Sequence, residues 1–237
     1  MGQKYSEYNS DFYGSASVFY RIELSNVIKD VDKLIYLDVD TITHKDLNEF
    51  YNIDMGKNYY MGFPGHDLTF IEFNGTRNFI NTGVILINLK KLREVNATFL
   101  LKDYYNKYGT QKVDEYLINA VFYDKISFLP LIYGIPDFGA GSGTTLNPSH
   151  FLKKFNNYIN YTEYDMEKAS QNRVITHMCY EMKKWWNRNY DDLTKIGKQW
   201  LFYAAKSNIF DDICQNYTQF QPFCEKIKNE NNISLIT

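Results

Sequence analysis

Two acidic residues separated by one valine, Asp38 and Asp40, form the pair whose spacing points most directly to chemistry. Like charges close together repel, and each carboxyl then resists ionisation unless a cation offsets the repulsion. The pair follows the apolar run of residues 33–37, so both side chains point the same way where an extended strand passes into a loop. Such oxygen ligands suit a hard cation such as Mn²⁺ or Mg²⁺, which keeps open positions for substrate phosphates. An Asp-x-Asp pair alone is weak evidence, so the surrounding elements matter.

The run of residues 33–37 has no polar alternation, which predicts a strand buried on both faces of a parallel sheet. Open α/β sheets bind ligands at the carboxyl ends of such strands. Hydrophobic spacing predicts further strands and several helices, and their alternation indicates an α/β fold. The further strands are expected at 58–63, 79–88, 126–131 and 174–177, and the helices at 15–30, 46–51, 89–108, 114–123 and 191–206.

Length and composition limit the organisation of the chain and its partners. With 237 residues and 44% hydrophobic content, we expect one domain over residues 1–206 and a polar, loosely packed tail over 207–237. A net charge of -2 offers no broad basic face, so no nucleic-acid partner is expected. No apolar stretch is long enough for a transmembrane segment.

The three cysteines bear on the compartment. Cys179, Cys214 and Cys224 are an odd number and lack metal-type spacing, so we expect no closed disulfide set. This favours a reducing environment, and the expected location is cytoplasmic.

Three segments follow the acidic pair in order and add to its meaning. They are FINTGVILINL from residue 79, DEYLIN from residue 114 and HMCYEMKKW from residue 177. With them, the chain resembles glycosyltransferase family 8, the retaining sugar transferases that include glycogenin and bacterial lipopolysaccharide galactosyl- and glucosyltransferases. The resemblance runs from about Ser17 to Trp186 and also includes Tyr20-Arg21 and YLDVDT. It implies a nucleotide-diphospho-sugar transferase fold of the GT-A type, with a mixed sheet flanked by helices.

The resemblance implies roles for residues whose types match the family motifs. Asp38 and Asp40 would ligate Mn²⁺ or Mg²⁺, with His177 as the third protein ligand, a role that neutral imidazole fills well. Lys183 would contact the donor diphosphate, and Arg21 would either neutralise the same region or hold hydroxyls of the donor sugar. Both cations would then lie where departing UDP gathers negative charge.

A second group of residues would face the transferred sugar. Asn81 and Asp114 match family residues that hydrogen-bond it, while Thr82 and Gly83 line the same wall. The expected substrate-binding set is therefore Arg21, Asp38, Val39, Asn81, Thr82, Gly83 and Lys183.

Beside Asp114, the expected catalytic partner Glu115 stands where the family usually has glutamine. Retention of configuration needs either a nucleophile on the far face of the sugar or departure and attack on one face. The Glu115 carboxylate fits the first route by analogy with retaining glycosidases. It is equally consistent with a charged variant that has no nucleophilic role.

The chain also departs from the family pattern. Family members carry a uridine-binding section many tens of residues long before the metal motif, whereas 37 residues precede Asp38, so an N-terminally truncated or decayed copy is expected. Tyr180 replaces a glycine whose backbone approaches the phosphate. Lys184 replaces the proline before Trp185.

The implied function is metal-dependent, retaining transfer of a hexose from a UDP-sugar to a glycan or lipopolysaccharide-type acceptor, chosen by loops such as 64–78 and 135–148. One alternative is an inactive remnant that serves as a binding or partner subunit, with a partner chain or oligomer covering an exposed sheet edge. Another is a phosphatase of the haloacid dehalogenase type, which also places Asp-x-Asp after a strand. That class requires Thr or Val where this chain has Ile42 and a later Gly-Asp-rich loop that the sequence lacks.

Overall fold

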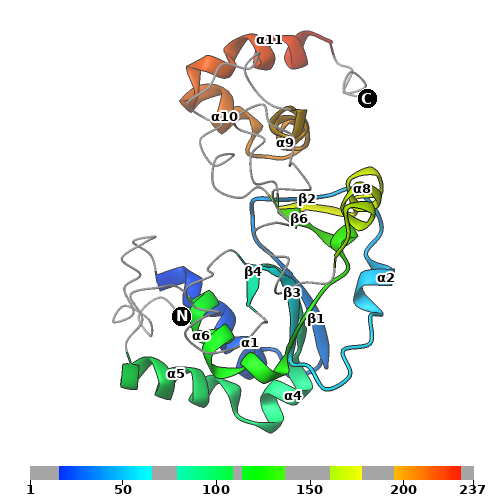
Figure 1. Cartoon of the computed structure of the whole chain (residues 1–237). Helices are drawn as coiled ribbons and strands as arrows, with labels where there is room; N and C mark the ends of the chain where they lie inside the picture. Colours follow the sequence, from blue (N-terminus) through cyan, green and yellow to red (C-terminus); the bar gives the residue numbers. More distant parts are fainter. Residues whose placement is uncertain (1–15, 66–78, 109–113, 137–160, 178–194, 231–237) are drawn as a thin grey trace.

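A computed structural model describes residues 16–65, 79–108, 114–136, 161–177 and 195–230. Within these ranges the chain forms a four-stranded sheet with helices on both faces, a smaller three-stranded sheet beside it, and a group of C-terminal helices (Figure 1).

The larger sheet is mixed and has the strand order β1-β4-β3-β5. β1 and β3 run antiparallel to β4, and β5 runs parallel to β3. The sheet and its flanking helices confirm the expected α/β class with a mixed sheet. The four strands in this order are β1 (Lys33–Leu37), β4 (Ile80–Asn88), β3 (Tyr60–Pro64) and β5 (Ile126–Phe128).

The prediction that β1 belongs to a parallel sheet is wrong. In the described residues β1 is an edge strand that pairs antiparallel with β4, and all five of its residues are half-buried. Its run of apolar residues has another cause, because Leu34 and Tyr36 pack against one core while Ile35 and Leu37 pack against the other. An edge strand covered on both faces therefore has the same hydrophobic pattern as a central parallel strand.

β4 separates two hydrophobic cores. Its side chains alternate between them, with Ile85 and Ile87 in the first and Val84 and Leu86 in the second. Successive residues of a strand point to opposite faces, so a continuous apolar run supplies both cores. This central strand is therefore well suited to hold the residues at its amino-terminal end in fixed positions.

Helices cover both faces of the larger sheet (Figure 1). Phe19, Leu92 and Leu101 join the first core, whereas Phe50 stacks on Tyr133 in the second, with ring centroids 4.7 Å apart. The helices on the first face are η2 (Ala16–Glu23), α1 (Leu24–Val27), α4 (Leu89–Glu94), α5 (Ala97–Tyr108) and α6 (Asp114–Val121). Those on the second side are α2 (Asn48–Tyr51), η4 (Leu131–Tyr133) and α8 (Glu163–Gln171), and η3 (Tyr123–Lys125) joins α6 to β5.

Two of the observed helices differ in detail from the helices that the sequence predicts. The helix expected at 89–108 is split into α4 and α5, because Asn96 adopts φ 51° in the left-handed region, which asparagine tolerates better than most residues. The helix expected at 15–30 is a 3₁₀ helix, η2, that continues as the short α1 and ends at Val27.

The smaller sheet has the order β2-β7-β6. β2 (Thr41–Thr43) follows the acidic pair directly, β7 (Ile175–His177) pairs antiparallel with it, and β6 (Ile135–Pro136) runs parallel to β7. This sheet therefore joins segments that are far apart in the sequence.

Residues 207–230 differ from the loose tail that their polar composition predicts. They form α10 (Phe210–Asn216), η7 (Thr218–Phe220) and α11 (Gln221–Glu230), which share a core with α9 (Lys195–Ala205). Short amphipathic helices can be polar on average and still bury a few aromatic residues. A division into a domain over 1–206 and an appended segment stays a prediction.

The inference of a reducing environment loses its support, because Cys214 and Cys224 are bonded between α10 and α11. An odd number of cysteines leaves one over but does not prevent a single pair. Among the helices of the described ranges, none is both long enough and apolar enough to cross a membrane.

Candidate metal and donor site

The acidic pair lies in the loop that joins β1 to β2, and two hydrogen bonds fix its backbone. The Asp38 amide donates to the Gly83 carbonyl oxygen at 2.7 Å, and Thr41 Oγ1 donates to the Asp38 carbonyl oxygen at 2.8 Å. The side chains of Asp38 and Asp40 are largely buried, whereas Val39 between them is 99% exposed. This alternation places both carboxylates on one side of the loop, as their spacing predicts.

Strand β7 brings His177 to this pair. Thr41 lies opposite His177 in the β2–β7 ladder, so the imidazole is adjacent to Asp40. His177 Nε2 is 3.2 Å from Asp40 Oδ1 and 3.9 Å from Asp38 Oδ2, and one ligand atom of each residue lies within 4.8 Å of the others. The imidazole is nearly inaccessible to solvent, since His177 is only 5% exposed. The three residues expected to bind a cation are therefore together.

Gly83 makes room for the imidazole. A Cβ at this position would lie 2.1 Å from His177 Cε1 and 2.6 Å from Nε2, which are severe clashes. A residue without a side chain is needed here because the ring approaches the backbone closely. The resemblance implies that Gly83 lines the sugar site, and the geometry adds that Gly83 determines where His177 can lie.

The donor set of this cluster fits a divalent cation. Carboxylate oxygens suit both Mg²⁺ and Mn²⁺, and an imidazole nitrogen is more compatible with Mn²⁺ because Mg²⁺ is bound mainly through oxygen. Three protein ligands also leave coordination positions for other oxygens, such as those of a phosphate.

Arg21, which η2 contributes, connects the cluster to the rest of the site. Its Nη1 donates to the Thr82 carbonyl oxygen at 2.7 Å, its Nη2 to Asp38 Oδ1 at 3.1 Å, and its Nε lies 2.7 Å from Asp114 Oδ2. Burial alone lowers the pKa of Arg21, but Asp114 and Asp38 outweigh that effect and raise it. The guanidinium therefore stays charged and holds two carboxylates in place.

Tyr36 is a residue of this site that the sequence reasoning missed. Its hydroxyl donates to Asp38 Oδ1 at 2.9 Å, and the Arg21 guanidinium lies 4.5 Å above its ring. Burial raises the pKa of Tyr36 to about 12, so the hydroxyl keeps the proton that it donates. The signal was present in the sequence, because residues 36 and 38 of an extended strand share a face.

The first turn of α6 contains Asp114 and Glu115. A hydrogen bond from the Thr82 amide to Glu115 links this turn to the amino-terminal end of β4. Asp114 is 2% exposed, and burial raises the pKa of its carboxyl to about 6 although Arg21 acts to lower it. Burial likewise raises the pKa of Glu115 to about 7, although the bond from the Thr82 amide acts to lower it. Burial thus disfavours the charged form of both carboxyl groups, and the Arg21 guanidinium opposes this effect.

Glu115 and Asn81 bind each other. Glu115 Oε2 accepts from Asn81 Nδ2 at 2.9 Å and from the Thr82 amide at 3.2 Å, while Asn81 Oδ1 accepts from the Gly83 amide at 3.0 Å. Both ends of the Asn81 amide are therefore engaged within the protein. The second N–H of Nδ2 and the second lone pair of Oδ1 are still available for a hydrogen bond to a sugar.

A second missed residue, Asn119, fastens α6 to β4. Its Oδ1 accepts from the Ile80 amide at 2.8 Å, and its Nδ2 donates to the carbonyl oxygens of Ile80 at 2.8 Å and Glu115 at 2.7 Å. It is fully buried. Because it follows Glu115 by one helical turn, Asn119 holds the start of α6 against the strand that carries Asn81, Thr82 and Gly83.

The structure thus brings together every expected site residue that falls in its described ranges, except that Val39 points away from the cluster. Lys183, the expected diphosphate ligand, lies outside the described residues, as do Tyr180 and Lys184.

Comparison with solved structures shows which class of protein has this fold. The chain superposes on the galactosyltransferase LgtC in complex with donor and acceptor sugar analogues with a TM-score of 0.54, at 20% identity, over 72% of this chain and 61% of LgtC. It superposes on the apo form of the glycosyltransferase GlyE of Streptococcus pneumoniae with a TM-score of 0.55, at 20% identity, over 90% of this chain and 46% of GlyE. The fold is that of a GT-A-type glycosyltransferase.

The chain belongs to glycosyl transferase family 8, whose model matches residues 2–189. A relative from Haemophilus influenzae, whose own assignment as a glycosyltransferase is provisional, is 27% identical over 91% of this chain and 63% of its own length. GlyE is 26% identical over 79% of this chain and 46% of its own length. The chain therefore spans between about half and two thirds of the curated relatives that it matches.

Proposed function

We propose that the chain is a metal-dependent retaining hexosyltransferase that moves a hexose from a UDP-sugar to a glycan or lipopolysaccharide-type acceptor. The observation that supports this most strongly is the convergence of Asp38, Asp40 and His177, whose ligand atoms lie within 4.8 Å of one another. Family membership supports glycosyl transfer as the reaction class. The donor, the metal and the acceptor are the parts that need a test.

In this proposal Asp38, Asp40 and His177 hold Mn²⁺, with Mg²⁺ as the less favoured ion. When bound, the cation offsets negative charge on the diphosphate of the leaving UDP. Arg21 lies beside the cluster and keeps Asp38 oriented, and Lys183 is proposed to supply a further positive charge to the diphosphate. Such preorganised charge is usually the largest contribution to the catalysis of group transfer.

The transferred sugar is proposed to lie against the amino-terminal end of β4, near Asn81, Thr82 and the buried Asp114. Asp114 is held by Arg21, so its carboxylate is fixed before substrate arrives. A fixed acceptor can hydrogen-bond a sugar hydroxyl without paying a large reorganisation penalty. Val39, exposed beside the cluster, is proposed to contact substrate from the outer side of the loop.

Glu115 allows two routes to retention. As a nucleophile it would use Oε1, because Oε2 accepts two hydrogen bonds within the protein. As a positioning residue it would only hold Asn81 and Thr82. Glu115→Gln keeps an acceptor at this position and separates the routes: loss of a nucleophile should lower kcat by roughly a thousandfold or more, whereas loss of positioning should cost about tenfold.

The direct test is release of UDP from UDP-glucose and UDP-galactose with Mn²⁺ present. We expect slow hydrolysis or transfer that EDTA abolishes and that Asp40→Asn abolishes. Binding of sugars without metal-dependent hydrolysis would favour the inactive remnant. The phosphatase alternative loses its support with the family assignment, and phosphate release from an aryl phosphate, sensitive to Asp38→Asn, would restore it.

Two broader expectations remain proposals. A partner chain or a second copy is proposed to cover the exposed edge at β1, which in the described residues pairs with β4 alone, and light scattering in solution tests this. A cytoplasmic location is proposed as well, but the Cys214–Cys224 disulfide removes the cysteine argument for it, because such bonds persist mainly in oxidising compartments.

A further inference from the structure

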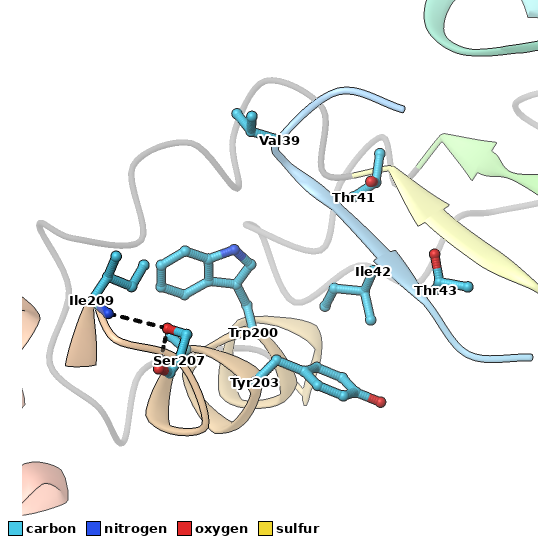
Figure 2. Close-up of a pocket in the computed structure, with 9 residues that line it drawn as sticks. Val39, Thr41, Ile42, Thr43, Trp200, Tyr203, Ser207 and Ile209 are labelled. Atoms are coloured by element: carbon cyan, nitrogen blue, oxygen red, sulfur yellow. Dashed lines mark hydrogen bonds between the residues drawn. The ribbon is translucent and has the colours of Figure 1, made fainter. Parts of the chain in front are cut away.

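A hollow of about 310 Å³ lies on the outer side of the acidic loop, between β2 and α9. Figure 2 shows Val39 and the side chains of β2 on one wall, with Trp200, Tyr203 and Ser207 on the other. Ligand sites commonly measure about 300–1,000 Å³, so this hollow has room for a ligand of one or two rings.

The lining of the hollow suits a neutral, hydroxyl-rich ligand. Among the described residues that line it, none has a charged side chain, and the rings of Trp200 and Tyr203 offer apolar faces beside it. Aromatic faces of this kind pack well against the C–H faces of sugar rings. Tyr203 remains 46% exposed, so a ligand would bury surface that the folded chain leaves open.

Two hydroxyl groups of the lining, those of Thr41 and Ser207, can accept hydrogen bonds from a ligand. Thr41 Oγ1 donates its hydrogen to the Asp38 carbonyl oxygen. Ser207 Oγ donates to the Ala204 carbonyl oxygen at 2.7 Å and accepts from the Ile209 amide at 3.4 Å, which leaves it one lone pair. A hydroxyl whose hydrogen is already donated still has lone pairs, so it accepts hydrogen bonds from a ligand. Sugar hydroxyls supply such donors in number.

The position of the hollow connects it to the candidate reaction centre. Val39 lines it, and the residues on either side of Val39 are the two carboxylates of the metal-type cluster. Neighbouring Cα atoms are about 3.8 Å apart, so the Val39 end of the hollow lies close to both carboxylates.

We infer that the hollow is a carbohydrate subsite that binds one ring of the acceptor. This inference rests on the proposed glycosyl transfer. The donor nucleotide is a poorer occupant, because its diphosphate belongs with the cation and Arg21 on the inner side of the loop.

The test compares variants of the hollow with a control tyrosine. Tyr203→Ala removes one aromatic face, Thr43→Trp fills the space from the exposed end of β2, and Trp200→Ala removes the other face. Tyr164→Ala on α8 is the matched control, because Tyr164 is 69% exposed and does not line the hollow. Trp200 also packs against the C-terminal core, so Tyr203→Ala and Thr43→Trp keep the test valid if Trp200→Ala fails to fold.

The probes are methyl β-D-galactopyranoside, methyl β-D-glucopyranoside, lactose and uridine, each followed by saturation-transfer NMR, with hydrolysis of the UDP-sugar by water measured in parallel. We expect at least one sugar to bind the wild-type chain and Tyr203→Ala to weaken it about tenfold, as truncation of an aromatic anchor commonly does. Thr43→Trp should abolish that binding, and the Tyr164→Ala control and the rate of hydrolysis should not change.

Three results would overturn the inference: no binding of any of the sugars, sugar binding that is equal in Tyr203→Ala, Thr43→Trp and the control, or uridine binding that these variants weaken in place of sugar binding. Failure of the wild-type chain to hydrolyse UDP-sugars with Mn²⁺ would instead count against the proposed function. The two failures are therefore distinguishable.

Discussion

The two carboxylate oxygens of Asp38 have different neighbours, and this difference determines which oxygen faces the candidate metal position. Oδ1 accepts from Tyr36 and Arg21, whereas Oδ2 faces His177 at 3.9 Å. A carboxylate held on one side offers the other oxygen to a cation in a fixed direction. Tyr36 is therefore a positioning residue for the candidate metal ligand.

Removal of the Tyr36 hydroxyl should weaken Mn²⁺ binding without destroying it. For Tyr36→Phe we predict a roughly tenfold higher Kd for Mn²⁺ by calorimetry, because loss of such a supporting hydrogen bond typically costs 10–100-fold in affinity. Tyr51→Phe is the control, since its hydroxyl also makes one hydrogen bond, to the Lys33 carbonyl oxygen at 3.2 Å, away from the cluster. Equal affinities in Tyr36→Phe and Tyr51→Phe would contradict this role.

Glu115 should make the stability of the chain depend on pH. Burial raises its pKa from 4.5 to about 7, so between these values the folded chain binds more protons than the unfolded chain. The free energy of unfolding should then fall as pH rises through this window. Asp114, whose pKa is also raised, contributes in the same direction and stays in the variant.

We therefore predict that Glu115→Gln shows a shallower fall in stability between pH 4.5 and 7 than the wild-type chain, measured by urea unfolding at several pH values. Asp103→Asn on the exposed surface of α5 should keep the wild-type slope. If the slope in Glu115→Gln equals that of the wild-type chain, the carboxyl does not titrate in this range.

At the residue scale, sequence patterns were sufficient where a motif fixes both residue type and spacing. Asp38, Asp40 and His177 were predicted on this basis, and their side chains converge. Tyr36 and Asn119 lie within the segments that carry the resemblance, but no role was assigned to them, because each acts through a hydrogen bond to a partner and residue type alone does not reveal that bond.

Among the elements, the approach of β4 to β7 decides whether the cluster can form. Gly83 of β4 leaves the space that the His177 ring occupies. For Gly83→Ala we predict a loss of Mn²⁺ binding and a destabilisation of about 1–3 kcal/mol, as expected when a methyl group is forced into a packed site. Calorimetry and urea unfolding measure the two effects.

Gly56→Ala is the control for this substitution. A Cβ at Gly56 meets no atom within 4 Å, although the residue has φ +47°, so it tests the backbone cost of replacing a glycine without a clash. We expect a loss of about 1 kcal/mol and unchanged Mn²⁺ binding. Wild-type Mn²⁺ affinity in Gly83→Ala would show that His177 does not require this space.

The type of most elements could be predicted from hydrophobic spacing, but their neighbours could not. β3, β4 and β7 begin and end within about two residues of the predicted bounds, as boundary uncertainty allows. The pairing of β1 was missed because an edge strand between two cores has the same apolar pattern as a buried parallel strand. The break at Asn96 depends on one left-handed residue, which periodicity does not detect.

For the molecule as a whole, the C-terminal helices form a unit with its own core and the Cys214–Cys224 disulfide. The bond closes a loop with a sequence separation of 10. Closing a loop of this size is worth about 2–3 kcal/mol in the chain-entropy description. The group of helices α9–α11 should therefore respond to reduction more strongly than the sheet does.

We predict that dithiothreitol increases amide hydrogen exchange in α10 and α11 by at least about tenfold and leaves β4 unchanged, because local opening reports local stability. Mass spectrometry of the alkylated, unreduced chain should show that Cys214 and Cys224 are protected. Full alkylation of both thiols in the native, oxidised chain would show that the disulfide does not form.

The most direct test of the account is the melting temperature of the chain with Mn²⁺ and a UDP-hexose. A ligand at a hundredfold excess over Kd stabilises the folded state by about 2.7 kcal/mol, or roughly 5–10 °C for a chain of this size. We predict this rise for the wild-type chain and for Asp103→Ala, and its loss in Asp40→Ala and His177→Ala. A rise of the same size in both Asp40→Ala and His177→Ala would contradict the metal centre on which the account depends.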